Sequence, residues 1–137
     1  MLSQRPAGPT LESVSSQAQI LIVEDDDDLR AVVSEMLKQL GYSVATAING
    51  RDALDYLRAH RAPGLIVLDL MMPVMDGVEF CRRRLRDPAL RSIPLFLFTA
   101  RGQSIANVSA VKVLRKPLVV EEFIDAVRSV VQPAASS

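Results

Sequence analysis

The chain has 137 residues, of which 49% are hydrophobic and 23% charged, and its 16 Lys and Arg balance its 16 Asp and Glu. This composition is typical of one globular domain and excludes a disordered chain. The zero net charge argues against direct nucleic-acid binding, which needs a surplus of Lys and Arg. The lone Cys81 excludes a disulfide scaffold, and no apolar run reaches the about 20 residues of a membrane helix. We therefore expect a cytoplasmic protein without membrane contact.

The two ends of the chain differ in composition from its middle. Residues 1–18 contain two prolines, a glycine and four serines without an apolar period, so we expect a flexible leader. Residues 133–137 are expected to form a short tail. The segment between them, residues 19–132, is expected to fold as one domain.

Within this segment, short apolar runs alternate with stretches of helical periodicity. The runs predict strands at residues 20–23, 42–47, 65–68, 93–98 and 111–114. The periodic stretches predict helices at residues 29–40, 53–57, 77–86 and 123–131, with a turn at Asn49-Gly50. In the third of these helices we expect an inward face and an arginine-rich outward face. The inward residues are Val78, Cys81 and Leu85, and the outward ones are Arg82, Arg83, Arg84 and Arg86. Strand and helix in alternation predict a parallel sheet with helices on both faces.

Polar residues follow the predicted strands where each strand ends. The first strand ends in Glu24-Asp25, the third in Asp69, the fourth in Thr99 and the fifth in Lys116. The carboxyl ends of neighbouring parallel strands open on one edge of the sheet, where ligands bind. We therefore expect three carboxylates, a hydroxyl and an ammonium to converge there.

Three close carboxylates repel one another, and a hard divalent cation relieves this repulsion. Oxygen ligands without His or Cys favour Mg²⁺, or Mn²⁺, over zinc. Together with a lysine and a threonine, such a cation suits a phosphoryl group, and a carboxylate can attack phosphorus to form an aspartyl phosphate. Asp69 follows the central apolar strand, so we take it as the nucleophile.

Each of these residues also has an ordinary structural role. Acidic residues before a helix commonly cap it, which is our interpretation of the run from Asp26 to Asp28. A strand-end Asp is often a turn residue, and a lone Lys is often a solvated charge. Only the ordered set of strand ends is specific.

Four segments together resemble the receiver domain of two-component response regulators. They are residues 20–28 with Arg30, the segment LIVLDLMMPVMDG at 65–77, the pair Thr99-Ala100, and the pair Lys116-Pro117. The resemblance covers residues 19–131. It implies a flavodoxin-like, doubly wound five-stranded parallel sheet in the order 2-1-3-4-5.

The resemblance also implies a role for each site residue. Asp69 would be the phosphorylated aspartate. Asp25 would bind Mg²⁺ directly, Glu24 would bind it mainly through water, and the backbone carbonyl of Met71 would be a further ligand. Thr99 would contact the phosphoryl group and move toward it as the switch. Lys116 would pair with the phosphoryl oxygens, and its peptide bond to Pro117 is usually cis in the family.

The partners implied are a sensor histidine kinase or a histidine phosphotransfer protein as phosphoryl donor, and a downstream protein partner. Such a domain is not an enzyme in the usual sense, because it catalyses only its own phosphorylation and dephosphorylation.

Two departures from the family pattern concern the output. Family members usually carry an aromatic switch residue three positions before the lysine, where this chain has Val113. Residues 101–110 have few apolar anchors, so the fourth helix is expected to be short or missing. The segment at 113–117 is similar to a receiver subgroup linked to HWE-type histidine kinases, whereas residues 65–77 have the ordinary pattern. We expect residues 101–111 to be mobile and, with the fifth strand and the last helix, to form the partner surface.

Three other functions are compatible with parts of this pattern. A haloacid-dehalogenase-like phosphatase would need a second Asp at the position of Met71. A nucleotide-binding module would need a GxGxxG or GxxxxGK motif, and neither occurs. A receiver-like interaction module that does not depend on phosphorylation is the serious alternative. Val113 and the short segment after Thr99 favour it, and the intact site residues oppose it.

Overall fold

The computed structural model describes residues 18–69, 77–99 and 112–133. In these ranges, five strands form one parallel sheet in the order β2-β1-β3-β4-β5. The strands are β1 (Ile20–Val23), β2 (Val44–Ala47), β3 (Leu65–Asp69), β4 (Leu95–Thr99) and β5 (Lys112–Arg115). The flavodoxin-like, doubly wound fold predicted from the sequence is therefore confirmed.

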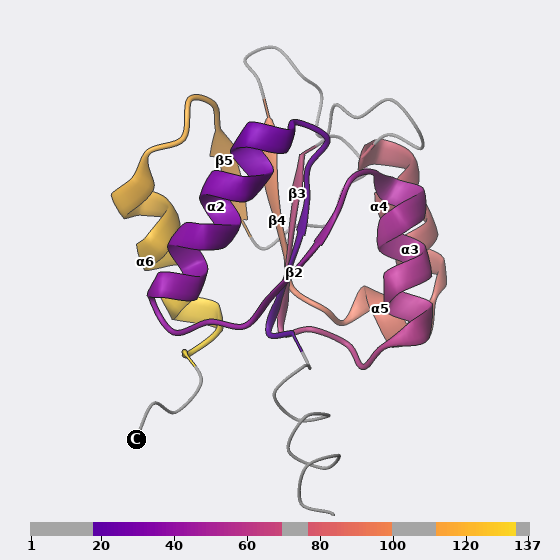
Figure 1. Ribbon diagram of the computed structural model, residues 1–137. Coiled ribbons are helices and arrows are strands. Elements are labelled where there is room, and N and C mark those ends of the chain that lie inside the picture. The colour runs from indigo at the N-terminus through magenta and orange to yellow at the C-terminus, as the bar shows by residue number, and fades with distance from the viewer. Residues whose placement is uncertain (1–17, 70–76, 100–111, 134–137) are drawn as a thin grey trace, which may run out of the picture.

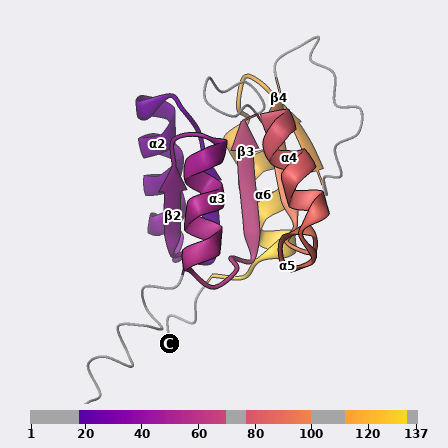
Figure 2. The same cartoon turned by 90° about the vertical axis from the view of Figure 1, so that its right-hand side faces the viewer.

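Helices cover both faces of this sheet. The helices are α2 (Asp27–Gln39), α3 (Gly50–Ala59), α4 (Gly77–Arg86), α5 (Pro88–Arg91) and α6 (Val120–Val130). Helices α2 and α6 lie on one face, while α3, α4 and α5 lie on the other (Figures 1 and 2). The carboxyl ends of the strands all point to the top of Figure 1, so that edge gathers the residues that follow them.

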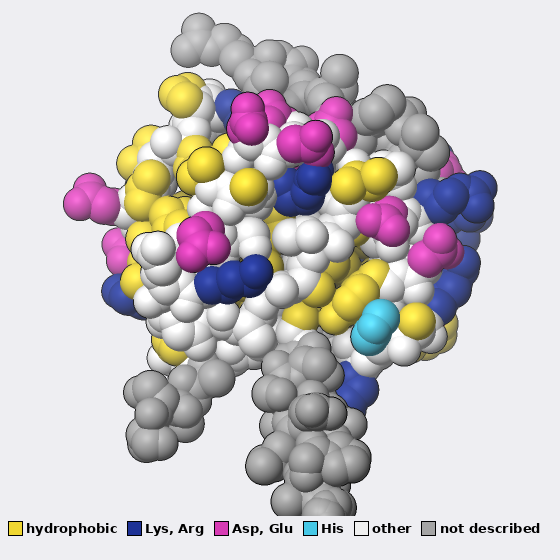
Figure 3. Space-filling model, in the orientation of Figure 1, with side chains coloured by type: hydrophobic (Ala, Val, Ile, Leu, Met, Phe, Trp, Pro, Cys, Tyr) yellow, Lys and Arg dark blue, Asp and Glu magenta, His cyan; other side chains and the backbone are white. Residues whose placement is uncertain are grey.

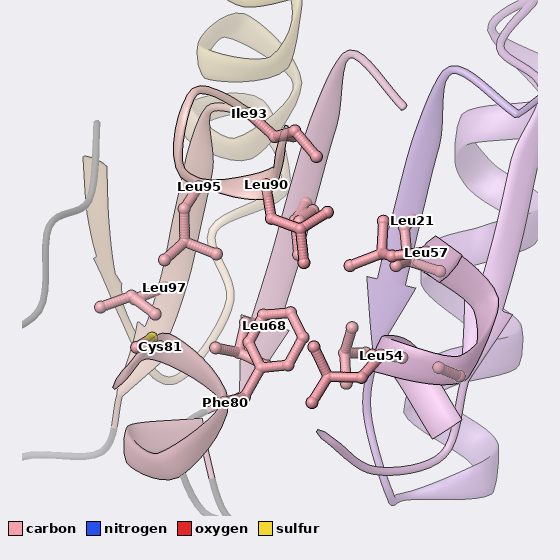
Figure 4. Close-up of a cluster of buried hydrophobic side chains, with 14 residues drawn as sticks. Leu21, Leu54, Leu57, Leu68, Phe80, Cys81, Leu90, Ile93, Leu95 and Leu97 are labelled. Carbon is pink, nitrogen blue, oxygen red and sulfur yellow. The ribbon is translucent and has the colours of Figure 1, made fainter. Parts of the chain in front are cut away.

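Two apolar clusters hold the layers together, one on each face of the sheet. On the α3–α5 face, Phe80 and Cys81 pack with leucines of β1, β3 and β4, as Figure 4 shows. On the α2–α6 face, the second cluster includes Phe96, Phe98 and Phe123. Strands β1 and β3 are buried along their whole length, because they lie inside the sheet and are covered on both faces. Their continuous apolar runs reflect this position.

Local signals explain where the helices begin. The Asp26 carboxylate caps α2 by accepting from the backbone N–H of Leu29 at 3.0 Å, which confirms the capping role expected of this acidic run. Asn49 caps α3 by accepting from the N–H of Asp52 at 2.8 Å. The Asp52 carboxylate in turn accepts from the N–H of Ile48, so the segment predicted as a turn at Asn49-Gly50 begins a helix instead. After α2 the chain turns at Gly41, whose φ of 99° suits glycine.

The inward face of α4 differs from the prediction at two positions. Arg84, expected to point outward, is buried at 4% exposure, and Leu85, expected to point inward, is 36% exposed. The Arg84 guanidinium donates to the backbone carbonyls of Ile93 and Arg91, which lie around the turn from α5 to β4. That turn contains the one-turn helix α5, which the sequence analysis did not predict. An arginine suits this buried position because backbone carbonyls point at it.

The family's fourth helix, predicted to be short or missing here, and the segment 101–111, predicted to be mobile, lie outside the described residues. In the described part of the chain, no helix combines the length and the apolar character needed to cross a membrane.

Candidate functional site

Three carboxylates meet at the carboxyl edge of the sheet. Glu24 follows β1 and Asp69 ends β3, and the pairing of Val23 with Leu68 puts these two acids level with each other. One oxygen each from Glu24, Asp25 and Asp69 can be chosen so that all three lie within 4.8 Å of one another. Glu24 and Asp69 are buried, whereas Asp25 is exposed. Acidic side chains gather at the same edge in the space-filling view (Figure 3).

Lys116 brings a cation to this cluster. Its Nζ donates to Oδ2 of Asp69 at 2.9 Å, and its backbone N–H donates to the Thr99 carbonyl at the same distance. The peptide bond between Lys116 and Pro117 is cis, as the resemblance implied. The end of β5 is thereby tied both to β4 and to the acidic cluster.

The crowding of charges changes two pKa values. Burial raises the pKa of Glu24 from 4.5 to about 7, and the charge of Asp69 acts in the same direction. The backbone N–H of Asp26, which donates to Oε2 of Glu24, and the Lys116 ammonium oppose this rise. Burial by itself would lower the pKa of Lys116, but the hydrogen bond to Asp69 and the nearby carboxylates outweigh it and raise the pKa. Within the described residues, the Lys116 ammonium contacts Asp69 but does not balance the charge of three carboxylates.

The donor set fits a hard divalent cation. It offers carboxylate oxygens alone, and its exposed member, Asp25, leaves a side open to water. Mg²⁺ prefers oxygen ligands and retains several waters, so these residues suit it. The proposed ligand Met71 lies outside the described residues.

Thr99 ends β4 next to this cluster and is fully buried. Its Oγ1 accepts a hydrogen bond from Nη1 of Arg115 at 3.1 Å. Arg115 is the cross-strand partner of Thr99 in the β4–β5 pair. Val113, two residues earlier on β5, is half-buried against the cluster on the α3–α5 face.

Sequence reasoning missed the contribution of Arg115. The signal that could have found it is the period of two along a strand: Arg115 shares a face of β5 with Val113 and directly precedes Lys116. Arg30 is a further supporting residue, because its guanidinium donates to the Glu24 carbonyl at 2.9 Å and pairs with Asp27. It ties the first turn of α2 to the end of β1.

This arrangement agrees with comparisons to known proteins. The family described as the response regulator receiver domain matches residues 20–128. The chain belongs to this family. Receiver domains of response regulators are signalling domains of two-component systems, and this domain accordingly serves two-component signal transduction.

Two curated relatives illustrate the match. The response regulator MprA of Mycolicibacterium vanbaalenii is 36% identical over 122 residues, which cover 82% of this chain and 50% of the relative. The transcriptional regulatory protein AfsQ1 of Streptomyces coelicolor is 46% identical over 86 residues, which cover 63% of this chain and 36% of that protein. The receiver domain thus spans half or less of the length of these relatives.

Solved structures of similar size resemble this receiver domain over most of their length. The chemotaxis protein CheY4 of Vibrio cholerae is 30% identical with a TM-score of 0.72, covering 84% of this chain and 99% of that chain. The signal receiver domain of a signal transduction histidine kinase from Syntrophus aciditrophicus is 31% identical with a TM-score of 0.71, covering 88% and 96% respectively.

Proposed function

We propose that this receiver domain accepts a phosphoryl group on Asp69 and that the aspartyl phosphate switches its contacts with a downstream protein. The observation that carries the proposal is the position of Asp69, buried among Glu24, Asp25 and Lys116 at the carboxyl edge of the sheet. A phosphohistidine on a sensor histidine kinase or a phosphotransfer protein is the donor. We propose residues 19–132 as the functional unit, in the cytoplasm, without direct contact to nucleic acid or membrane.

In the transfer step, a carboxylate oxygen of Asp69 forms a bond to phosphorus while the phosphorus–nitrogen bond of the donor breaks. The imidazole leaves with the bonding electron pair, and its nitrogen takes up a proton. The signal ends by hydrolysis of the aspartyl phosphate. Water attacks phosphorus, the bond to Asp69 breaks, and the products are free phosphate and the restored carboxylate. The domain thus acts on itself alone.

The residues around Asp69 have different roles in the phosphoryl transfer. A divalent cation held by Glu24, Asp25 and Asp69 would neutralise charge on the phosphoryl oxygens. Lys116 exchanges its bond to Asp69 for one to a phosphoryl oxygen, which carries more charge than the carboxylate it replaces. Thr99 donates its hydroxyl hydrogen to another phosphoryl oxygen.

The experiment is phosphorylation with a small phosphodonor and Mg²⁺, followed by mapping of the modified residue by mass spectrometry. We expect label on Asp69, and no label in Asp69→Asn, because the amide is not a nucleophile. Asp125→Asn is the matched control, since Asp125 is an exposed acid on α6. Full labelling of Asp69→Asn would assign the phosphoacceptor to another residue.

A second candidate function is protein binding that does not depend on phosphorylation. Val113 favours it, because this position usually holds the aromatic switch residue of the family. Partner binding by the Asp69→Asn variant distinguishes the two candidates. Under the first, the variant either loses binding or binds equally with and without a phosphodonor. Under the second, it binds the partner like the wild type.

A further inference from the structure

Arg115 contacts the candidate site through a hydrogen bond to the hydroxyl of Thr99. Nη1 of Arg115 lies 3.1 Å from Oγ1 of Thr99, and the two residues are paired across β4 and β5. Thr99 is completely buried, while the Arg115 residue is largely exposed. The guanidinium of an exposed arginine therefore donates to one buried hydroxyl on the neighbouring strand.

Arg115 is the last residue of β5 and Lys116 directly follows it, and these two neighbours reach different groups of the site. Arg115, which shares a face of β5 with Val113, contacts Thr99, whereas Lys116 contacts Asp69. Two neighbouring cations thus flank one strand end, one bound to the candidate phosphoacceptor and the other bound to the hydroxyl beside it.

The chemistry of a hydroxyl gives the Arg115 contact its consequence. A threonine hydroxyl has one hydrogen to donate and two lone pairs that accept. A guanidinium only donates, so its bond to Oγ1 uses a lone pair and leaves the hydrogen for a different partner. Thr99 is buried, so that partner is a group packed near it rather than bulk water, and a phosphoryl oxygen on Asp69 would be such a group.

We propose that Arg115 is a positioning residue for phosphorylation: it holds the Thr99 hydroxyl so that its hydrogen is directed to the phosphoryl group on Asp69. This inference rests on the proposed function. Val113 cannot supply such a contact, because its side chain has no polar atom and packs against the apolar cluster. Arg115 is therefore the side chain of β5 that couples to Thr99 in the described part of the chain.

A double-mutant cycle on the full chain tests this role. The rate of Asp69 labelling by a small phosphodonor with Mg²⁺ is measured for wild type, Arg115→Ala, Thr99→Val and the double variant. Loss of one hydrogen bond predicts that Arg115→Ala is slower by about fivefold. We expect no further slowing when Arg115→Ala is added to Thr99→Val, which has the shape of threonine without the hydroxyl. Arg115→Lys should recover part of the rate, and Arg86→Ala, which removes an exposed cation from α4, should label like wild type.

Each other result overturns the inference. An Arg115→Ala variant that labels at the wild-type rate shows that Arg115 has no role. Equal slowing by Arg115→Ala with and without the Thr99 hydroxyl shows that Arg115 acts by its charge alone. Urea unfolding of the same four proteins without metal gives a second reading, and coupling there but not in the labelling rate marks the bond as structural only. A wild-type chain that takes no label at all refutes the proposed function itself, which distinguishes that failure from the other three.

Discussion

At the scale of single residues, Glu24 is a buried carboxyl group of the site with a raised pKa. Its side chain is only 5% exposed and lies beside Asp69, which is why its pKa rises to about 7. The folded protein then holds a proton on Glu24 that the unfolded chain releases near pH 4.5. Folding stability without metal should therefore fall as the pH rises from about 4.5 to about 7, because the unfolded state binds fewer protons over this range.

Replacement of Glu24 by glutamine tests this linkage. One pKa unit corresponds to about 1.4 kcal/mol, so Glu24→Gln should gain at most about 3.5 kcal/mol at pH 8 relative to wild type. At pH 4 the two proteins should differ little. Urea unfolding in the presence of a chelator, at several pH values, measures both. If the variant keeps the pH slope of the wild type, the slope arises from another group.

Asp25 is the exposed carboxylate of the cluster, and it tests the cation site. Mg²⁺ should stabilise the wild type by about 2.7 kcal/mol at a concentration of 100 times Kd, because the unfolded chain does not assemble the site. Asp25→Asn should weaken this gain and should raise the stability without metal by relieving repulsion. Thermal melts with and without Mg²⁺ measure both effects.

Asp28→Asn is the control for this experiment, since Asp28 is an exposed acid nearby that lies outside the cluster. It should respond to Mg²⁺ like the wild type. A wild-type melting temperature that ignores millimolar Mg²⁺ would contradict the cation site.

At the scale of elements, the inward face of α4 contains a buried charged residue, Arg84. Arg84 lies between α4 and the turn from α5 to β4, and its guanidinium donates to two backbone carbonyls there. The hydrophobic period alone suggests Leu85 for the inward position. The carbonyls of Arg91 and Ile93, seven and nine residues later, reverse this preference, because buried carbonyls need a donor.

Substitutions at these neighbouring positions should therefore differ sharply. Arg84→Ala leaves two carbonyls without this donor and should cost about 2–4 kcal/mol of unfolding free energy. Leu85→Ala removes a partly exposed side chain and should cost less than about 1 kcal/mol. Urea denaturation of both variants gives the comparison. A larger loss for Leu85→Ala than for Arg84→Ala would restore the inward face predicted from the sequence.

At the scale of the whole molecule, contacts at the lower edge of the sheet bring the two ends of the described chain together. Gln19 exchanges backbone and side-chain hydrogen bonds with Ser43, and its Nε2 donates to the Gln132 carbonyl at 2.8 Å. Tyr42 donates its hydroxyl to the Val131 carbonyl at 2.6 Å. These contacts lie at the edge of the sheet opposite the acidic cluster, so they bear on stability rather than on chemistry.

The proposed domain limits make a prediction about truncated chains. A chain of residues 18–133 keeps these contacts and should match the stability of the full chain within about 0.5 kcal/mol. A chain of residues 20–130 loses the bonds of Gln19 and the acceptor of Tyr42, and should be less stable by about 2 kcal/mol or more. Urea unfolding of the three chains decides this. A marked loss in the longer fragment would extend the domain beyond its proposed limits.

The sequence by itself determined the alternation of the five strands with the longer helices, the parallel sheet and the acidic strand ends, but not the one-turn helix α5. These features depend on patterns within a few residues, such as the apolar runs of β1 and β3 and the period of α6, and on the rule that parallel strands end at one edge. Tertiary structure alone decided the inward turn of Arg84, the bond from Arg115 to Thr99 and the raised pKa of Glu24. Each of these depends on which groups of other helices, strands and turns come into contact, and that follows from register and packing rather than from the pattern within one element.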